Sequence, residues 1–466
     1  MFWYGFFFFF FFFFLIIYLT FFLLQIKLYS LDLGFFIKSN INTLLGFSIL
    51  VGFIFSLNYL YVYFTYLISF NFSNLFGLYD STLLTSSSLI SFYYFPYIYI
   101  FLFITLLSII TCLAYNNNES FLFITYCLII TMAGIFVFFT NSILVFFLAY
   151  EMLLLPSFFI LYRFAKTRRS IEAAYLMFFW TQFGALFLII TFLFIFLLSN
   201  SIIFSDLQNI PLSRFEHQII VFLLIIGFGV KLPIWPFYGW LPKAHVEAST
   251  NFSIFLSGVL VKIAFFSLFR CLVELQMEVG FIEILPLLIV GLFDSLFKMF
   301  YQIDLKKLVA YSTVVEMHWL TICIFSGFTP LLLAGFCMLI SHALISSNSF
   351  FLVDSINRRF KTRLITEVSG ISILCPHLFI LILINTLLFF VFLLDQNPIF
   401  FLLILPLLYL LGPIFFFRSW SNVMFGSSSF LMKKIPLDAS NFELILCGGV
   451  EILLIWLGLT WQFYNY

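Results

Sequence analysis

Among the ionisable side chains within long apolar stretches of this sequence, four stand out, and all four are of types that bind and release protons. They are Glu151, Lys231, Lys262 and His342. An ionised lysine at bilayer depth costs about 2.5 to 3.5 kcal/mol on insertion scales, so it persists only where a partner compensates it or a function uses it. An imidazole exchanges its proton between about pH 5 and 8. This set of residues is therefore suited to proton transfer inside an apolar protein.

The elements that must hold these residues are membrane helices. The chain is 64% hydrophobic and 9% charged, with a mean hydropathy of +1.18, and a water-soluble domain of this composition would expose large apolar patches. Since about twenty apolar residues cross a bilayer as a helix, the sequence predicts about fourteen spans. Their approximate cores are 3–25, 45–69, 93–114, 120–140, 142–162, 173–198, 219–237, 251–272, 281–300, 307–326, 330–353, 369–393, 399–417 and 442–462.

The basic residues give these spans an orientation. Loops after even-numbered spans hold only Arg214 and Arg270. Loops after odd-numbered spans hold many more: Lys27, Lys38, Arg163, Lys166, Arg168, Arg169, Lys243, Lys298, Lys306, Lys307, Arg358, Arg359, Lys361, Arg363, Arg418, Lys433 and Lys434. Because positively charged loops stay on the side of synthesis, the odd-numbered loops should face that side and both termini the other.

The composition also excludes several functions. A net charge of +1 argues against nucleic-acid binding, which needs a clustered basic face. The seven cysteines form no Cys-x-x-Cys pair, so neither a disulfide framework nor an iron–sulfur site is expected. Gly227 and Gly229 make too short a match for a dinucleotide-binding loop. Phenylalanine supplies 75 of 466 residues, a bias that AT-rich codons produce and that indicates an organellar genome.

A series of motifs runs from Leu144 to Arg363 in a fixed order. They are Tyr150-Glu151 before Pro156, Val230-Lys231-x-Pro233, Trp240-Leu-Pro-Lys-Ala-His-Val-Glu-Ala248, Lys262 before Arg270, Asp304-Leu-Lys-Lys-Leu-Val-Ala-Tyr-Ser312 and Ser341-His342-Ala-Leu-x-Ser-Ser347 before Arg358. In order and spacing they resemble the chain 4 family of mitochondrial NADH:ubiquinone oxidoreductase, respiratory complex I, an antiporter-like membrane-arm subunit. The resemblance implies an all-α integral membrane fold of about fourteen transmembrane helices, with two inverted five-helix repeats and broken helices.

The resemblance also implies a division of the chain. Residues 1–118 would form transmembrane helices 1 to 3, and residues 119–273 the first repeat, helices 4 to 8. Residues 274–418 would form the second, inverted repeat, helices 9 to 13, and residues 419–466 a connection and helix 14.

The function implied by the resemblance is proton translocation, coupled to electron transfer from NADH to ubiquinone. The chain would lie in the inner mitochondrial membrane as a multi-pass protein, beside lipids, neighbouring antiporter-like chains and other membrane-arm subunits, and would be encoded in the mitochondrial genome. This chain is expected to bind no cofactor or metal and no nucleic acid. NADH, FMN, iron–sulfur clusters and ubiquinone would belong to partner subunits.

The resemblance further implies roles for the ionisable residues inside the spans. Glu151 would face Lys231 as a separable ion pair, Lys262 would be the central relay lysine, and His342 would carry the proton onward. Two prolines follow Lys231 at positions 233 and 236, and their missing amide donors predict a helix break there, where water can enter.

Two places depart from the family's pattern. Where its tenth span carries histidine, this chain has Glu316, with His318 turned about 200° away on a helix, and either could serve the relay. Where its twelfth span carries glutamate, the acid here is Asp395, just before Pro398. Asp395 is either the exit carboxyl of the path or the cap of a loop between spans twelve and thirteen. Glu451, in the last span, is expected to make a packing or subunit contact.

The remaining polar residues carry weaker signals. His245 and Glu247 follow span seven and are interpreted as gating or structural residues, with Lys243 four residues before Glu247 and able to pair with it on a helical turn. The His-x-Glu order makes no metal site, because no cysteine pair or second histidine cluster completes it. Asp294 and Lys298, also four apart, are expected to form a local helix pair.

Two other function classes fit the same composition. A related cation/proton antiporter shares these motifs, although the His-Val-Glu-Ala sequence and the codon bias favour the respiratory family. Co-purification with NADH dehydrogenase activity distinguishes the two. A structural membrane scaffold without transport would keep pumping intact when its buried charges are neutralised.

The charge asymmetry generates a first prediction. The loops from Arg163 to Arg169 and from Arg358 to Arg363 should face the matrix. Protease or thiol-reactive probes added to intact organelles should therefore miss both loops and reach them only after the inner membrane is opened. Labelling of either loop from the intermembrane side would contradict this topology.

Overall fold

The structure is a computed structural model that describes residues 101–112, 120–140, 142–164, 167–204, 213–275, 284–326, 329–394, 405–426 and 438–462. Within these ranges the chain is helical, and its only β-type contacts are two isolated bridges, Ser142 with Ile203 and Asp304 with Leu364. The all-helical fold class is therefore confirmed for this part of the chain. The predicted spans 3–25 and 45–69, and Asp395, lie outside the described residues.

Each predicted span from the third onward overlaps a helix. The first half contains Phe101–Cys112, α5 (Ser120–Phe139), α6 (Ile143–Glu151), α7 (Leu154–Arg163), α8 (Arg168–Ser199), α10 (Arg214–Lys231), α11 (Trp240–Glu247), α12 (Thr250–Phe255) and α13 (Val261–Glu274). The second half contains α14 (Leu285–Phe300), α15 (Leu305–Phe325), α16 (Thr329–Phe360), α17 (Ile371–Leu374), α18 (Pro376–Leu394), α19 (Leu405–Phe425) and α20 (Asn441–Gln462).

Five helical stretches of the described chain are long and apolar enough to cross a membrane. They are Ile143–Arg163, Arg168–Ser199, Thr250–Glu274, Leu305–Phe325 and Ala334–Phe360. Three of the remaining helical stretches are apolar but shorter: Phe101–Cys112, Leu122–Phe138 and Pro376–Phe389. These lengths and compositions identify the chain as a membrane protein.

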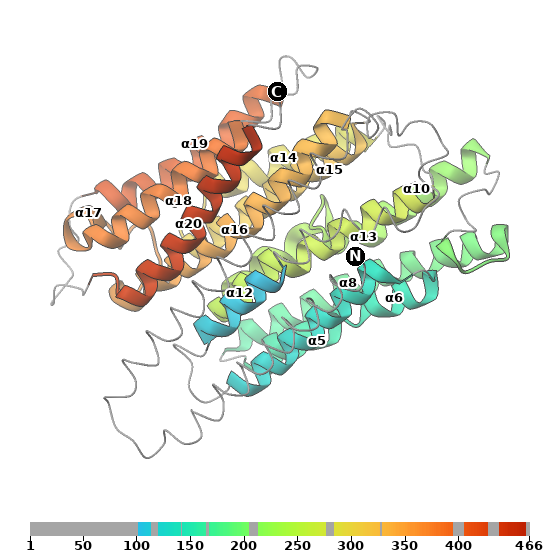
Figure 1. The fold of residues 1–466 in the computed structure, drawn as a ribbon, viewed down its shortest axis with the longest axis horizontal. Helices are drawn as coiled ribbons and strands as arrows, with labels where there is room; N and C mark the ends of the chain where they lie inside the picture. Colours follow the sequence, from blue (N-terminus) through green and yellow to red (C-terminus); the bar gives the residue numbers. More distant parts are fainter. Residues whose placement is uncertain are drawn as a thin grey trace. The chain divides into compact units, whose positions relative to one another are not determined.

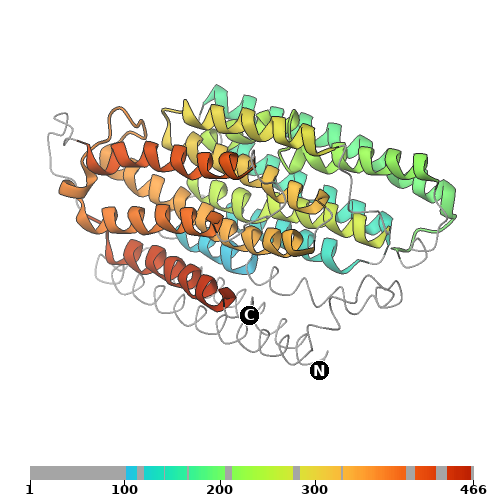
Figure 2. The same ribbon diagram turned by 90° about the horizontal axis from the view of Figure 1, so that it is seen from above.

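The helices run roughly parallel to one another in both views (Figures 1 and 2). α16 contacts α12, α15, α18 and α20, so it connects the middle of the chain with its C-terminal helices. α8 packs along α10, and a Cβ atom on Gly184 of α8 would lie only 2.7 Å from the carbonyl oxygen of Gly227 on α10. Such small residues let two membrane helices approach closely.

Two of the predicted spans are interrupted near their middle. The span near 142–162 is divided at Met152 and Leu153, between α6 and α7, because Pro156 has no N–H to donate to the Met152 carbonyl. The span near 251–272 contains a π-helical turn, η2 (Leu256–Leu260), between α12 and α13. Both interruptions lie next to residues singled out from the sequence, Glu151 and Lys262.

Arg270 occupies a place that the sequence did not predict. It was assigned to a loop, but it lies on α13, is 6% exposed, and donates to the carbonyl oxygens of Val137 at 2.6 Å and Phe138 at 3.0 Å, and also to Thr140. These carbonyls belong to the C-terminal end of α5, where the helix lacks amide partners of its own. Arg270 thus closes that end.

The C-terminal helix α20 is anchored at its first turn. Glu443 accepts hydrogen bonds from Arg358 at 3.0 Å and from Arg359, both on α16. Just before the helix, Asp438 accepts from the backbone N–H of His377 at 3.0 Å. Burial by itself raises the pKa of Asp438, but hydrogen bonds, led by the one from the His377 backbone, outweigh it and leave that pKa below its ordinary value. α20 is therefore fixed against α16 and α18.

The cap on α5 can be tested with Arg270→Met, which keeps the apolar stem and removes the donors. Buried carbonyls left without a partner cost about 1 to 3 kcal/mol each, so the variant should lose thermal stability in detergent. Arg169→Met, at an exposed position on α8, is the matched control and should unfold like the unmodified chain. Equal unfolding temperatures for the two variants would contradict the capping role.

Candidate functional site

The first ion pair of the site joins two helix ends and is largely shielded from solvent. Lys231 is the last residue of α10 and Glu151 the last of α6, and the Lys231 Nζ lies 3.0 Å from a Glu151 carboxylate oxygen. The same ammonium donates to the Tyr150 carbonyl at 3.1 Å and lies 3.7 Å from the centre of the Tyr150 ring. A cation is favoured at a helix C-terminus, where free carbonyls concentrate negative charge. Lys231 therefore neutralises the ends of both helices as well as the carboxylate.

One oxygen of the pair has no partner. Glu151 Oε2 is buried and makes no hydrogen bond within the described part of the chain. The two side chains are 17% exposed for Glu151 and 12% for Lys231, so the pair lies almost out of solvent. The carboxylate is thus held through a single oxygen.

The helix break after Lys231 is held by substitute hydrogen bonds. Pro233 has no N–H for the Gly229 carbonyl, and the Ile234 N–H donates to that carbonyl instead, at 2.9 Å. The Val230 carbonyl then lacks its ordinary partner and accepts from the indole N–H of Trp240 at 2.8 Å. The predicted break is therefore present, and the Gly229 and Val230 carbonyls keep hydrogen-bond donors.

A second buried lysine lies beside the π-helical turn. Lys262 is fully buried on α13, and its Nζ lies 3.2 Å from Nδ1 of His342 on α16. It also donates to the carbonyl of Ser257, in the π-turn, where the wider winding disturbs the regular hydrogen-bond pattern. The other ring nitrogen of His342 is buried and has no partner among the described residues. Lysine and histidine are placed for direct proton exchange.

Glu316 and His318 point to different parts of the site. Glu316, 2% exposed on α15, interacts electrostatically with Lys262. His318 is fully buried and accepts the Trp235 backbone N–H through Nε2 at 3.0 Å, with its Nδ1 2.8 Å from the Val314 carbonyl. Nδ1 therefore carries the proton and the ring is neutral. The charge of Glu316 acts on the central lysine, whereas His318 supports the break.

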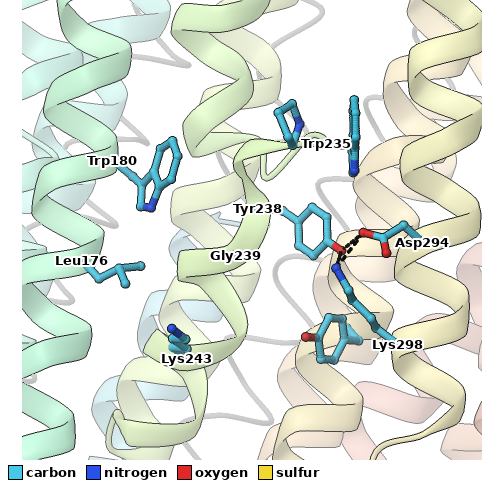
Figure 3. A pocket seen from close by; sticks show the side chains of 10 residues that line it. Leu176, Trp180, Trp235, Tyr238, Gly239, Lys243, Asp294 and Lys298 are labelled. Carbon is cyan, nitrogen blue, oxygen red and sulfur yellow. Dashed lines mark hydrogen bonds and ion pairs between the residues drawn. The ribbon is translucent and has the colours of Figure 1, made fainter.

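A pocket of about 340 Å³ opens beside the break (Figure 3). Tyr238 points toward Asp294 and Lys298 of α14, and its hydroxyl bonds to Asp294 and accepts from Lys298 at 2.6 Å (Figure 3). The Lys298 Nζ lies 2.7 Å from Oδ2 of Asp294. The prediction of a local helix pair is therefore too narrow, because Tyr238 joins the pair to the segment that follows Lys231.

Comparison with known proteins places this geometry in a family. Residues 140–424 match the family described as NADH:quinone oxidoreductase/Mrp antiporter, TM. The chain belongs to this family. A relative named NADH-ubiquinone oxidoreductase chain 4, from Paramecium tetraurelia, is 36% identical over 324 residues, which are 66% of this chain and 68% of the relative. The resemblance to the chain 4 family is thus confirmed.

A further relative and two solved structures are also similar to this chain. The chain 4 protein of Marchantia polymorpha is 31% identical over 57% of this chain and 52% of its own. Among solved structures, a chain of respiratory complex I from Thermus thermophilus is 22% identical with a TM-score of 0.67, covering 79% of this chain and 80% of that one. A chain of the Mrp complex from Dietzia sp. DQ12-45-1b is 16% identical with a TM-score of 0.65, covering 79% and 81%. These likenesses support the antiporter-like fold.

The stretch that follows the break in this antiporter-family chain is more buried than predicted. His245 lies in helix α11, is fully buried, and stacks on Phe350 with ring centres 4.7 Å apart. The sequence predicts a loop after span seven, which holds Lys243, His245 and Glu247; this prediction is wrong, because the chain resumes a helix at Trp240. Glu247 accepts from the Thr167 hydroxyl at 3.3 Å, and the described residues show no ion pair between it and Lys243.

Lys306 is a buried cation that sequence reasoning missed. It was placed in a loop, but it lies in the first turn of α15, is 3% exposed, and donates to the Ala248 carbonyl at 2.6 Å. The signal was available, since Asp304 caps the helix N-terminus and puts Lys306 inside its first turn. Tyr238 carried no comparable signal, because its partners are on another helix.

The contact between His318 and the break can be tested at Gly291 on α14. A methyl group at Gly291 would overlap the His318 ring and the Trp235 side chain. Gly291→Ala should therefore displace the ring and destabilise the protein by about 1 to 3 kcal/mol, as overpacking does.

The control for this variant is Gly448→Ala on α20, where an added Cβ meets nothing within 4 Å. Alanine is the better helix former, so this variant should be unchanged or slightly more stable in thermal unfolding. Matching behaviour of the two variants would show that the close packing at Gly291 has no energetic role.

Proposed function

We propose that this chain is a proton-translocating membrane-arm subunit of respiratory complex I, in the inner mitochondrial membrane. It would be one chain of the H⁺-translocating NADH:ubiquinone reductase. NADH, FMN, iron–sulfur clusters and ubiquinone would be bound by partner subunits, and this chain would move protons without a cofactor of its own. Membership of the antiporter family and the relatives named for chain 4 support this proposal. Encoding in the mitochondrial genome is a further part of the proposal, supported by the phenylalanine bias.

The observation that carries the proposal is the succession of buried or largely shielded ionisable groups across packed helices. Glu151 and Lys231 end α6 and α10, α10 packs against α13, and α13 carries Lys262 beside His342. Burying so many ionisable side chains is expensive, and inside membrane proteins they mark ion and proton paths. Their order along the packed helices is the order required of a relay.

The first step would occur at the pair of Glu151 and Lys231. While the carboxylate is 3.0 Å away, its negative charge favours the ammonium form of the lysine. When the carboxylate separates, that stabilisation is lost and the lysine can release its proton into the break. The neutral amine still has hydrogens for the Tyr150 carbonyl, so the end of α6 keeps its partner.

The second step would occur at the Lys262 ammonium. Its proton would pass to Nδ1 of His342 across 3.2 Å, leaving a neutral amine and a protonated imidazole. Glu316, on the opposing helix α15, would hold the positive charge of Lys262 before that transfer. In this assignment Glu316 takes the relay position and His318 supports the break. His245 and Glu247 would be structural, and Asp395 stays a candidate for the exit.

The two-repeat division also belongs to this proposal. Residues 119–273 and 274–418 would be inverted repeats, flanked by 1–118 and 419–466. Interruptions at Met152 and in the π-turn Leu256–Leu260 support a broken-helix design for the first repeat. The rival function, a subunit of a cation/proton antiporter, draws support from the Mrp complex chain of similar fold. Co-purification with NADH dehydrogenase activity would decide between the two.

The relay is tested by Lys231→Ala and Glu151→Gln in the assembled complex. Each variant removes one charge of the separable pair, and each should lower proton uptake by reconstituted vesicles by at least about tenfold, as loss of a proton-transfer group does. Quinone reduction coupled to pumping should fall with it.

Glu172→Gln is the matched control, because its side chain is 65% exposed on α8 and pairs with Arg168 at the surface. It should pump normally. Unimpaired pumping in both Lys231→Ala and Glu151→Gln, with the complex assembled, would contradict the relay proposal.

A further inference from the structure

A second group of buried polar side chains lies away from the two lysines, where α16, α18 and α20 meet. The Asn348 Nδ2 on α16 donates to Asn385 Oδ1 on α18 at 3.1 Å and to Glu451 Oε1 on α20 at 3.3 Å. Asn385 in turn donates to the hydroxyl of Ser349 at 2.8 Å. All four side chains are buried, with exposures of 2 to 3%. This group joins three helices that contact one another directly.

The group continues the polar face that begins at His342. His342, Ser346 and Ser349 are spaced i, i+4 and i+7 along α16, so they lie on one face of the helix. All three are buried. Seven residues of helix rise by about 10 Å, so this face leads from the partner of Lys262 to the hydrogen-bonded group.

Glu451 has an unusual environment for a carboxyl group. Within the described chain its only hydrogen-bond partner is the Asn348 amide, and it belongs to no ion pair. The arginines of α16 bind Glu443 instead, eight residues earlier on α20 and about 12 Å away along the helix axis. A buried carboxylate without a cation is costly, whereas its protonated form can donate a hydrogen bond. Asn348 Oδ1, buried and without a partner among the described residues, is an acceptor for it.

A purely structural contact does not account for these features. Three buried amide and hydroxyl groups could bond to one another and leave the carboxyl group out, and a leucine would fill the space on α20 at lower cost. The carboxyl adds a group that can take up and release a proton at the end of a polar face.

We infer that Glu451 is a proton-carrying carboxyl of this subunit, loaded from His342 along the polar face of α16. In the transfer the protonated imidazole of His342 loses its proton, the Glu451 carboxylate gains it, and the ring returns to its neutral form. The serine hydroxyls and asparagine amides between the two residues supply polar groups that can hold bridging water. The inference rests on the proposed proton-pumping function and extends it to the last helix. It replaces the expectation that Glu451 makes only a packing or subunit contact.

The test is Glu451→Gln in the assembled complex, measured as proton uptake by reconstituted vesicles. Glutamine preserves size and hydrogen bonding, so the helices should stay together while uptake falls at least about fivefold, as loss of a proton-transfer group does. Glu172→Gln, at the surface, is the control for the same chemical change and should leave uptake unaltered.

Lys231→Ala separates the possible failures. If Lys231→Ala is impaired and Glu451→Gln pumps at the unmodified rate, the inference about Glu451 is wrong and the relay proposal stands. If both variants pump at the unmodified rate, the relay proposal and the inference about Glu451 are both wrong.

A second measurement covers loss of assembly in Glu451→Gln. Carbodiimides react with protonated carboxyl groups in apolar surroundings, so a lipid-soluble carbodiimide applied to the unmodified complex should modify Glu451 and inhibit pumping, as peptide mass spectrometry and vesicle assays would show. Complete inhibition with no adduct on Glu451 would overturn the inference.

Discussion

Free carbonyl groups at interrupted helix ends are the constraint on which this structure depends. Each interruption leaves carbonyls without amide partners inside an apolar protein, where an unsatisfied polar group costs several kcal/mol. Buried cations occupy these positions repeatedly: Arg270 at the end of α5, Lys231 at the end of α6, Lys306 at the end of α11, and Lys262 at the π-turn. At every site the cation binds a backbone carbonyl, and at two of them it also pairs with a carboxylate, Glu151 for Lys231 and Glu274 for Arg270.

Lysine and arginine have different consequences in this arrangement. An arginine never loses its proton in a protein, so Arg270 stays positively charged and keeps donating to the carbonyls at the end of α5. A lysine that gives up a proton remains a hydrogen-bond donor, so the carbonyl beside it keeps a partner in either state. Lys231 and Lys262 can therefore change charge while the backbone around them stays satisfied. The same contact that stabilises the break makes the lysine suitable for proton transfer.

The sequence predicted the parts of this site that depend on local chemistry. Two prolines after Lys231 predicted the break, and the apolar runs predicted the helices that the structure describes. Local patterns do not predict contacts between segments far apart in the chain. The partner of Lys231, for example, lies 80 residues earlier and was found only through the family resemblance. Nothing local indicated that Tyr238 would join Asp294 to Lys298, since a tyrosine hydroxyl binds whatever the fold brings near. The π-turn before Lys262 was missed because its sequence is ordinary for a helix.

The two sides of the first ion pair differ in how firmly they are held. The segment after Lys231 is tied by the Trp240 indole to Val230 and by the His318 ring to Trp235, two contacts from separate elements. Glu151 is held by one oxygen, its other oxygen is unbonded within the described chain, and α6 ends directly after it. Displacing Lys231 would break the bonds that satisfy the proline-containing segment, whereas displacing Glu151 breaks one ion pair. Separation of the pair is therefore easiest through movement of the carboxylate, and the lysine stays where its proton can enter the break.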